Sequence, residues 1–185
     1  MRLSRILLAS VVVIAGVGAA AWWLSSYDPS EFRGAGPMKD YGVFGYYRYH
    51  APLGEVPLAV AGTYTLHFSG LPAEKMGLQL YVPGGSNNRE LLQSLSTELR
   101  AEIVDSRGTI LCSATGPPRN RGADPNHWVV MSDGTDAAYW HDQCREVSFR
   151  RHTDYALIVT ISNVDPRSPP VGLRAMLEGG GIELS

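Results

Sequence analysis

The residues whose chemistry is most clearly defined are the two cysteines of the chain, Cys112 and Cys144. In an oxidising compartment an isolated pair of this kind usually forms a disulfide. Closing the loop between them would stabilise the fold by about 3–4 kcal/mol on the chain-entropy model. Two buried free thiols are the alternative, and two cysteines alone are too few ligands for a structural zinc site. We therefore expect a Cys112–Cys144 disulfide.

Histidines and aspartates could also form a site. The spacing of His127 and His141-Asp142 permits metal ligation across two loops, which needs several ligands converging at about 2.0–2.2 Å. The turn Asp133–Asp136 lacks the remaining oxygen ligands of a calcium loop. A hydrolase would need a nucleophile beside a base, and His141-Asp142 or His152 with Asp154 could supply the base. The nucleophile-elbow, phosphate-loop, dinucleotide and zinc-protease motifs are absent. We expect no catalytic residues, metal or cofactor.

Two segments could form a binding surface. Residues 41–50 gather aromatic rings with Arg48 and His50; Tyr and Arg often anchor protein interfaces, and aromatic faces also stack on sugars. The same segment could be a first strand, although the adjacent Tyr46 and Tyr47 break its alternation. The loop 114–128 is rich in Pro, Gly and Asn, and such loops often carry recognition or are mere decoration. The candidate binding residues are Tyr46, Tyr47, Arg48, Tyr49, Arg119, Arg121 and Trp128.

Composition limits the classes of protein to consider. The chain has 185 residues, of which 44% are hydrophobic and 18% charged, with a formal net charge of −2. These values are typical of one globular domain with a real core. Low net charge with many aromatic and β-branched residues excludes a disordered chain. The absence of a basic block argues against nucleic-acid binding.

An apolar run near the start predicts export. Residues 6–24 contain no charged residue, and a helix of that length would span about 28 Å, close to the hydrocarbon core of a bilayer. Arg2 and Arg5 precede the run and Trp22-Trp23 end it, which places the N-terminus in the cytoplasm. A signal peptide cleaved near Ala21 is the alternative, but such h-regions usually have about 7–15 residues.

The remainder reads as strands. Alternating apolar residues or turn signals predict them at 63–69, 78–82, 98–104, 109–114, 129–132, 146–149, 155–162 and 171–178. Residues 105–108 are expected to form a hairpin turn, 146–149 and 155–162 a further hairpin, and 89–96 is the one possible helix. The predicted organisation is a transmembrane anchor or signal peptide at 1–25, a tether at 26–37, and an exported, all-β antiparallel sandwich with jelly-roll-like order at 38–185.

The rhythm of Gly62–Leu66, Leu99–Val104 with its turn, Asp154–Val159 and Leu173–Leu177 resembles small exported bacterial jelly-roll modules. Pre-peptidase C-terminal domains, uncharacterised envelope families and periplasmic immunity proteins are similar in this way. The resemblance covers residues 56–180 and implies a module that binds or caps another molecule. It assigns no functional residue, since fold alone does not fix function.

These observations predict a single-pass protein of the bacterial inner membrane whose C-terminal domain lies in the periplasm and binds an envelope or secreted protein. An immunity-type or assembly role is the sharpest version of this prediction. The alternatives are a polysaccharide- or peptidoglycan-binding module and a minor envelope hydrolase.

Overall fold

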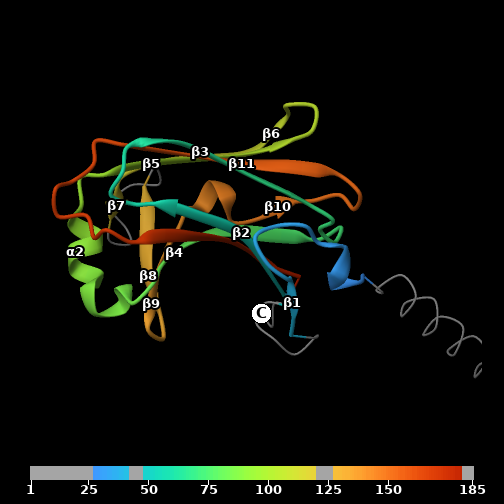
Figure 1. The fold of residues 1–185 in the computed structure, drawn as a ribbon, viewed down its shortest axis with the longest axis horizontal. Coiled ribbons are helices and arrows are strands. Elements are labelled where there is room, and N and C mark those ends of the chain that lie inside the picture. The colour runs from blue at the N-terminus through green and yellow to red at the C-terminus, as the bar shows by residue number, and fades with distance from the viewer. Residues whose placement is uncertain (1–26, 42–47, 120–126, 181–185) are drawn as a thin grey trace, which may run out of the picture.

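The computed structural model describes residues 27–41, 48–119 and 127–180, and in this part of the chain two sheets face each other (Figure 1). The larger sheet has the order β1–β2–β12–β4–β9–β8–β7, with β10 also paired to β4, and the smaller has the order β3–β11–β5–β6. The strands of the larger sheet are β1 (Lys39–Asp40), β2 (Tyr49–Pro57), β12 (Gly172–Gly179), β4 (Lys75–Val82), β9 (Asp136–Trp140), β8 (Trp128–Asp133), β7 (Pro118–Arg119) and β10 (Val147–Ser148). Those of the smaller sheet are β3 (Gly62–Ser69), β11 (Asp154–Ser162), β5 (Glu98–Asp105) and β6 (Ile110–Gly116). The predicted β-sandwich is therefore observed, and the described strand pairs are antiparallel apart from β7–β8, which is parallel.

Alternating side chains explain how the two sheets close on one core. In β5 the apolar residues Leu99, Ala101 and Ile103 are fully buried, while Glu98 and Arg100 are exposed. Residues of a strand point alternately to its two faces, so one face of β5 packs on the larger sheet and the other meets solvent. This is the orientation expected of a strand in which apolar and polar residues alternate.

The turn between β5 and β6 also follows from local sequence. Gly108 takes a left-handed conformation, with φ of +79°, which glycine adopts at little cost. The Asp105 carboxylate accepts hydrogen bonds from the backbone N–H groups of Arg107 and Thr109, both at 2.9 Å. The side chain thus stabilises the turn that the sequence predicted at 105–108.

One predicted connection differs in the structure. Residues 146–149 and 155–162 do not form a hairpin, because β10 pairs with β4 whereas β11 pairs with β3 and β5 in the other sheet. Phe149 and Tyr155 are buried, and their rings meet edge to face at 5.1 Å, while the connecting residues 150–152 are exposed. The two aromatic side chains therefore anchor a surface connection between the two sheets. The segment Asp133–Asp136 is the turn of a β8–β9 hairpin, in agreement with its lack of the oxygen ligands that a calcium loop needs.

Helical structure is brief. The helix α2 (Arg89–Ser94) forms within the predicted range, after a 3-10 turn at Gly85–Asn88, and further 3-10 turns occur at Pro29–Glu31 and Asp142–Cys144. Leu92 and Leu95 are fully buried. The helical segment therefore closes one end of the sandwich (Figure 1).

The disulfide prediction is confirmed. Cys112 of β6 is bonded to Cys144, with the two Cα atoms 5.3 Å apart. Because β6 lies in the smaller sheet and Cys144 follows β9 of the larger, the bond links the two layers of the sandwich.

The described part of the expected tether packs on the domain. Phe32 and Met38 are buried, the backbone of Arg33 pairs with Ser69, and the N–H of Ala35 donates to the carbonyl of Pro52. A tether was expected at 26–37, but buried Phe32 and the backbone hydrogen bonds of Arg33 and Ala35 hold this segment against the sandwich. The apolar run 6–24 lies outside the described residues, and among the described residues we find no helix with the length and apolar character to cross a bilayer.

Candidate functional site

A bulge in β2 shapes the outer face of the larger sheet. Pairing between β2 and β12 shifts register between Ala175 and Met176, so that Leu53 is an extra residue. The inward sequence Tyr49, Ala51, Leu53 then continues at Val56 rather than at residue 55. An extra residue of this kind re-aims the side chains that follow it. The bulge therefore places Glu55 on the exposed side of the strand.

Glycine is needed at the bulge itself. Gly54 has a φ of +148°, and a Cβ there would lie 2.9 Å from Cδ2 of Leu66 in the facing sheet. A side chain at this position would strain the backbone and collide with the core. The bulge therefore requires glycine at position 54.

The first of two hollows lies over β1, β2 and β12, and we call it the His50 hollow. Its volume is about 380 Å³. The segment packed beside β2 and the three strands line it, with the residues Ala35, Pro37, Lys39, Tyr41, His50, Pro52, Gly54, Glu55, Arg174, Ala175 and Met176. Tyr41 is 56% exposed and presents its ring edge-on to His50, with ring centres 4.7 Å apart. The hollow combines an aromatic rim with basic side chains.

A second hollow of about 360 Å³ lies at the far end of β2, and we call it the Val60 hollow. It is lined by Glu55, Val56, Pro57, Ala59, Val60, Pro170, Val171 and Gly172. Val60 is 53% exposed. Because Glu55 lines both hollows, they adjoin, and we refer to them together as the β2–β12 groove.

Glu55 depends on a glycine in the neighbouring strand. A Cβ at Gly172 would lie 1.6 Å from Oε1 of Glu55. Only glycine leaves room for the carboxylate to lie across β12 at this point. The pair Glu55 and Gly172 therefore fixes the boundary between the two hollows.

The buried carboxylate of Glu178 contacts the imidazole of His50. Glu178 is 3% exposed, and its Oε1 lies 2.9 Å from Nδ1 of His50. Gln79 Nε2 donates to Glu178 Oε2 at 2.6 Å, and the Tyr81 hydroxyl donates to Oε1 at 2.8 Å. We call Glu178, His50, Gln79 and Tyr81 the Glu178 cluster. Its members come from three adjacent strands and fix the orientation of the imidazole that lines the groove.

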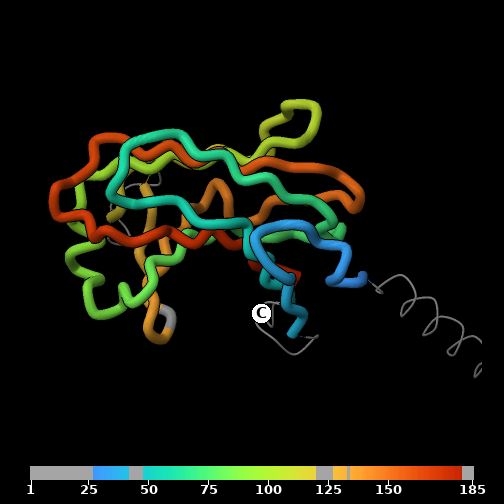
Figure 2. The backbone as a smooth tube through the Cα atoms, in the orientation of Figure 1, coloured from blue at the N-terminus to red at the C-terminus, as the bar shows by residue number. Residues whose placement is uncertain are grey.

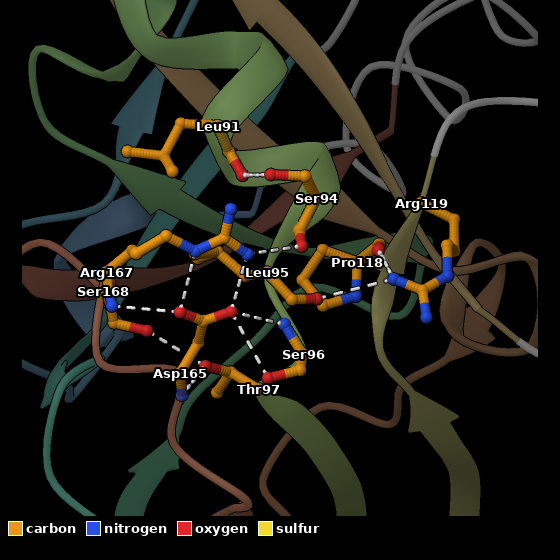
Figure 3. Close-up of polar contacts among 10 residues, drawn as sticks. All are labelled: Leu91, Ser94, Leu95, Ser96, Thr97, Pro118, Arg119, Asp165, Arg167 and Ser168. Carbon is orange, nitrogen blue, oxygen red and sulfur yellow. Dashed lines mark hydrogen bonds and ion pairs between the residues drawn. The ribbon is translucent and has the colours of Figure 1, made fainter.

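A second buried carboxylate organises the other end of the sandwich (Figure 3). Asp165 is 5% exposed and accepts from Nε and a terminal nitrogen of Arg167, at 3.0 and 2.8 Å. It also accepts from the backbone N–H of Ser96 at 3.0 Å, and its own N–H donates to the hydroxyl of Thr97. Thr97 in turn lies 2.9 Å from the Ser168 hydroxyl. We call these five residues the Asp165 cluster.

The charge of Asp165 is strongly favoured. The Arg167 guanidinium, followed by the Ser96 and Arg167 backbone N–H groups, holds the pKa of Asp165 far below its usual value. Hydrogen bonds and a cation that favour the charged form act in this direction. The carboxylate is therefore ionised at any physiological pH.

The Asp165 cluster positions the Val60 hollow. The connection from β11 to β12 crosses between the layers at the end where α2 lies (Figure 2), and Arg167 ties it to the carbonyl of Ser94. A few residues later, Pro170 and Val171 line the hollow. The carbonyl of Val171 accepts from the N–H of Leu58 at 3.0 Å, which joins the two walls. Each end of the groove is thus positioned by one buried carboxylate, Glu178 at the His50 hollow and Asp165 at the Val60 hollow.

The structure separates the predicted binding residues. Tyr49 and Trp128 are 1% and 0% exposed, so both belong to the core and neither can form a surface. Trp128 was expected at the end of an exposed loop, but its ring N–H donates to the carbonyl of Leu99 in the facing sheet. Tyr46, Tyr47 and Arg121 lie outside the described residues.

The two remaining arginines have local roles. Arg48 makes a two-pronged contact with Asp40, at 3.1 Å for each of its two shortest bonds, and its guanidinium lies over the ring of Tyr49. This pair closes the β1–β2 reversal beside the His50 hollow. Arg119 is exposed but donates to the carbonyls of Leu95 and Pro118 (Figure 3), away from the groove.

The histidines whose spacing would permit a metal site point into the body of the protein. His127 and His141 are 7% and 1% exposed, and burial lowers the pKa of His141. His141 accepts a hydrogen bond from the N–H of Gln143, capping a 3-10 turn, so it has a structural task. Among the described residues no group of three or more potential ligands could hold a metal ion.

The sequence did not single out Glu178, Gln79, Tyr81 or Asp165. The first three occupy outward positions of predicted strands, and only the strand order brings them together. Asp165 carried a readable signal, because Asp-x-Arg occurs both at 165–167 and in the correctly predicted turn at 105–107. In each case the aspartate accepts from the backbone N–H two residues later.

Comparison with models of known protein families, with curated proteins and with solved structures finds no match. The interpretation of the site therefore rests on its geometry.

Proposed function

We propose that this chain is an extracytoplasmic, membrane-anchored binding module and that its β2–β12 groove binds an envelope or secreted protein. One observation carries the proposal: two adjoining hollows are bordered by the exposed side chains of Tyr41 and Val60. Single exposed apolar residues are ordinary, but here each lies beside a concave surface. An immunity-type or envelope-assembly role fits such a surface.

Two features support a location of the domain outside the cytoplasm. The disulfide between Cys112 and Cys144 is of the kind that persists in an oxidising environment. The uncharged run 6–24 with its preceding arginines supports a membrane anchor with the domain outside the cytoplasm.

The strand order supports a jelly roll as the finer description of the sandwich. One sheet contains the order β2–β12–β4–β9 and the other β3–β11–β5–β6, so that most connections cross between the sheets while β5 and β6 form a hairpin within one of them. This is the arrangement that two Greek keys produce. Jelly rolls frequently present a sheet face to a ligand, although fold does not fix function.

The shape of the groove favours a chain-like ligand. It follows β2 from His50 to Pro57 and continues to Val60, a path of more than about 20 Å at the rise of a strand. A compact metabolite would fill one hollow and leave the other empty. A protein segment can contact both.

A glycan is the second candidate, and the exposed Tyr41 ring favours it, since aromatic faces stack on sugars. The His50–Glu178 pair would also suit a hydrolase that needs an oriented base. Both alternatives make different demands on the groove: a glycan requires the Tyr41 ring, and a hydrolase requires His50 together with turnover of a substrate.

The test is capture by the full-length, tagged chain from its own envelope, using a matched pair of variants. Val60→Asp places a charge in the groove, whereas Ile110→Asp places one at an equally exposed apolar residue, 56% against 53%, on β6 of the smaller sheet. We expect one stoichiometric protein with the wild type and with I110D, and its loss with V60D.

Three results would contradict the proposal in different ways. Capture of glycan alone, abolished by Tyr41→Ala, would favour the polysaccharide-binding alternative. Equal capture by V60D and wild type would place the partner elsewhere. Release of a cleaved product that His50→Ala abolishes would establish the hydrolase.

A further inference from the structure

We propose that the occupant of the β2–β12 groove is an extended segment of the partner protein with a defined pattern. The segment has an acidic side chain at Lys39, a basic side chain about four residues away at Glu55, and an aliphatic side chain about two residues further, in the Val60 hollow. This inference rests on the proposed function and specifies the ligand of the same site.

Two opposite charges in the groove carry the first part of the pattern. Lys39 and Glu55 are both exposed and line the His50 hollow. Neither has an ion-pair partner within the described ranges, whereas the nearby Arg174 is paired with Asp136 and Arg48 with Asp40. A ligand that supplied the two complementary charges would gain specificity and a defined orientation.

The register of the strands gives the spacing. Lys39 pairs with His50, which in turn pairs with Glu178, while Glu55 pairs with Arg174. The positions of Glu178 and Arg174 on β12 are four residues apart, or about 13 Å at the rise of a strand. An extended ligand lying along the strand therefore presents complementary charges at positions about four residues apart.

The Val60 hollow supplies the apolar end. Gly172 lines it two residues before Arg174 on β12, about 7 Å further along the groove. Its other lining residues are mainly proline, valine and alanine, apart from Glu55. Such a surface suits an aliphatic side chain.

Hydrogen bonds fix the residues that line both ends of the groove, which favours binding of one extended peptide conformation. The Glu178 cluster fixes His50 at one end, and the Asp165 cluster fixes the segment of Pro170 and Val171 at the other. A site with fixed walls binds with a smaller loss of conformational freedom. The groove can thus discriminate among sequences of the same length.

The test selects displayed random peptides of about ten residues on the detergent-solubilised full-length chain. We expect enriched peptides to share an acidic residue, a basic residue about four positions away, and an aliphatic residue about two positions beyond it. Fluorescence polarisation with one enriched peptide then compares Lys39→Glu and Glu55→Lys with the wild type. We expect each charge reversal to weaken binding about five- to tenfold.

Matched controls and a rescue make the test decisive. Arg89→Glu and Glu90→Lys reverse two exposed charges of the same signs on α2, at the end of the sandwich, and should leave the affinity unchanged. A peptide with its two charges exchanged should bind the K39E/E55K double variant better than the original peptide does. Reversed preference of this kind requires direct pairing of the charges.

Several results would overturn this inference. Enrichment of no peptide, enriched peptides without the charge pattern, equal effects of the α2 variants, or failure of the exchanged peptide would each do so. Protein capture that V60D abolishes would still support the proposed function in those cases, so the two failures are distinguishable.

Discussion

Two buried carboxylates in this protein have similar exposure and different tasks. Asp165 is 5% exposed and Glu178 is 3% exposed. Asp165 has a full cation, Arg167, together with backbone N–H donors from two segments. Glu178 has a glutamine amide, a tyrosine hydroxyl and His50. We infer that Asp165 stabilises the fold, whereas Glu178 orients a side chain of the groove.

The difference lies in what each carboxylate connects. Asp165 ties the connection that crosses between the two layers to the junction of α2 and β5 (Figure 3). Glu178 joins three strands that are already paired and positions a side chain that lines a groove. Loss of the first should therefore affect stability most, and loss of the second should affect binding most.

The largest expected effect is that of Asp165→Ala on stability. Removing the carboxylate leaves the Ser96 and Arg167 N–H groups without their acceptor and frees the crossover. We expect the largest loss of unfolding free energy in this set, measured by urea denaturation. Asp105→Ala removes the matching aspartate from the β5–β6 turn and is the control for a local turn contribution. A larger effect of D105A would contradict the role of the crossover.

Glu178→Ala should destabilise the protein by about 2–3 kcal/mol, because it leaves the buried Gln79 and Tyr81 without their shared acceptor. Glu98→Ala, at an exposed strand position, should change stability by less than about 0.5 kcal/mol. We expect E178A to weaken binding of an enriched peptide, measured by polarisation under conditions where the variant is fully folded. Unchanged affinity for the peptide would show that the Glu178 cluster does not contribute to binding in the groove.

The contribution of Asp165 to stability should be lost in acid. Because the pKa of Asp165 is lower in the folded chain than its usual value of 3.8, its contribution is complete above about pH 4 and is lost as the pH falls through the folded value. Unfolding free energies at a series of pH values should therefore drop steeply below about pH 4 in the wild type. The drop should be shallower in Asp165→Asn.

His141 should cause a separate loss of stability, at a higher pH than the loss caused by Asp165. Burial lowers the pKa of His141 from 6.5, so its contribution declines as the pH falls below 6.5. His141→Asn keeps an acceptor for the Gln143 N–H and should remove this earlier decline. A wild-type curve that stays flat from pH 7 to pH 5 would contradict the buried, neutral state of His141.

The smallest expected effect on stability is that of Gly172→Ala. The new methyl group displaces the exposed Glu55 side chain, and stability should change by less than about 0.5 kcal/mol. We expect peptides selected on G172A to lose their preference for a basic residue while keeping the acidic one. An unchanged preference would show that Glu55 does not contact the ligand.

Local pattern was sufficient to predict most of the strands, but not β2 at Tyr49–Pro57, which overlaps only the end of the possible first strand at 41–50. Alternation predicted β3, β5 and β11 close to their observed bounds, and the turn at Asp105 followed from residue types alone. The lone cysteine pair predicted the disulfide. These features depend on neighbours in sequence or on the only available partner.

Features that depend on pairing between distant strands could not be predicted in this way. Glu178 meets His50 on one side and Gln79 and Tyr81 on the other only because β12 lies between β2 and β4. The bulge at Leu53 is a property of the β2–β12 register. Tyr49 and Trp128 suggested a surface by residue type, but their positions on the inner faces of β2 and β8 bury them. Residue type alone does not tell which face of a sheet a side chain occupies.

The central claim is that the β2–β12 groove is the binding surface. A photo-crosslinking amino acid at position 60 of the full-length chain, expressed in its own cells, tests this most directly, with position 110 as the equally exposed control. We predict one discrete cross-linked protein from position 60 and none from position 110. A cross-linked protein from position 110 alone, or from both positions equally, would contradict the claim.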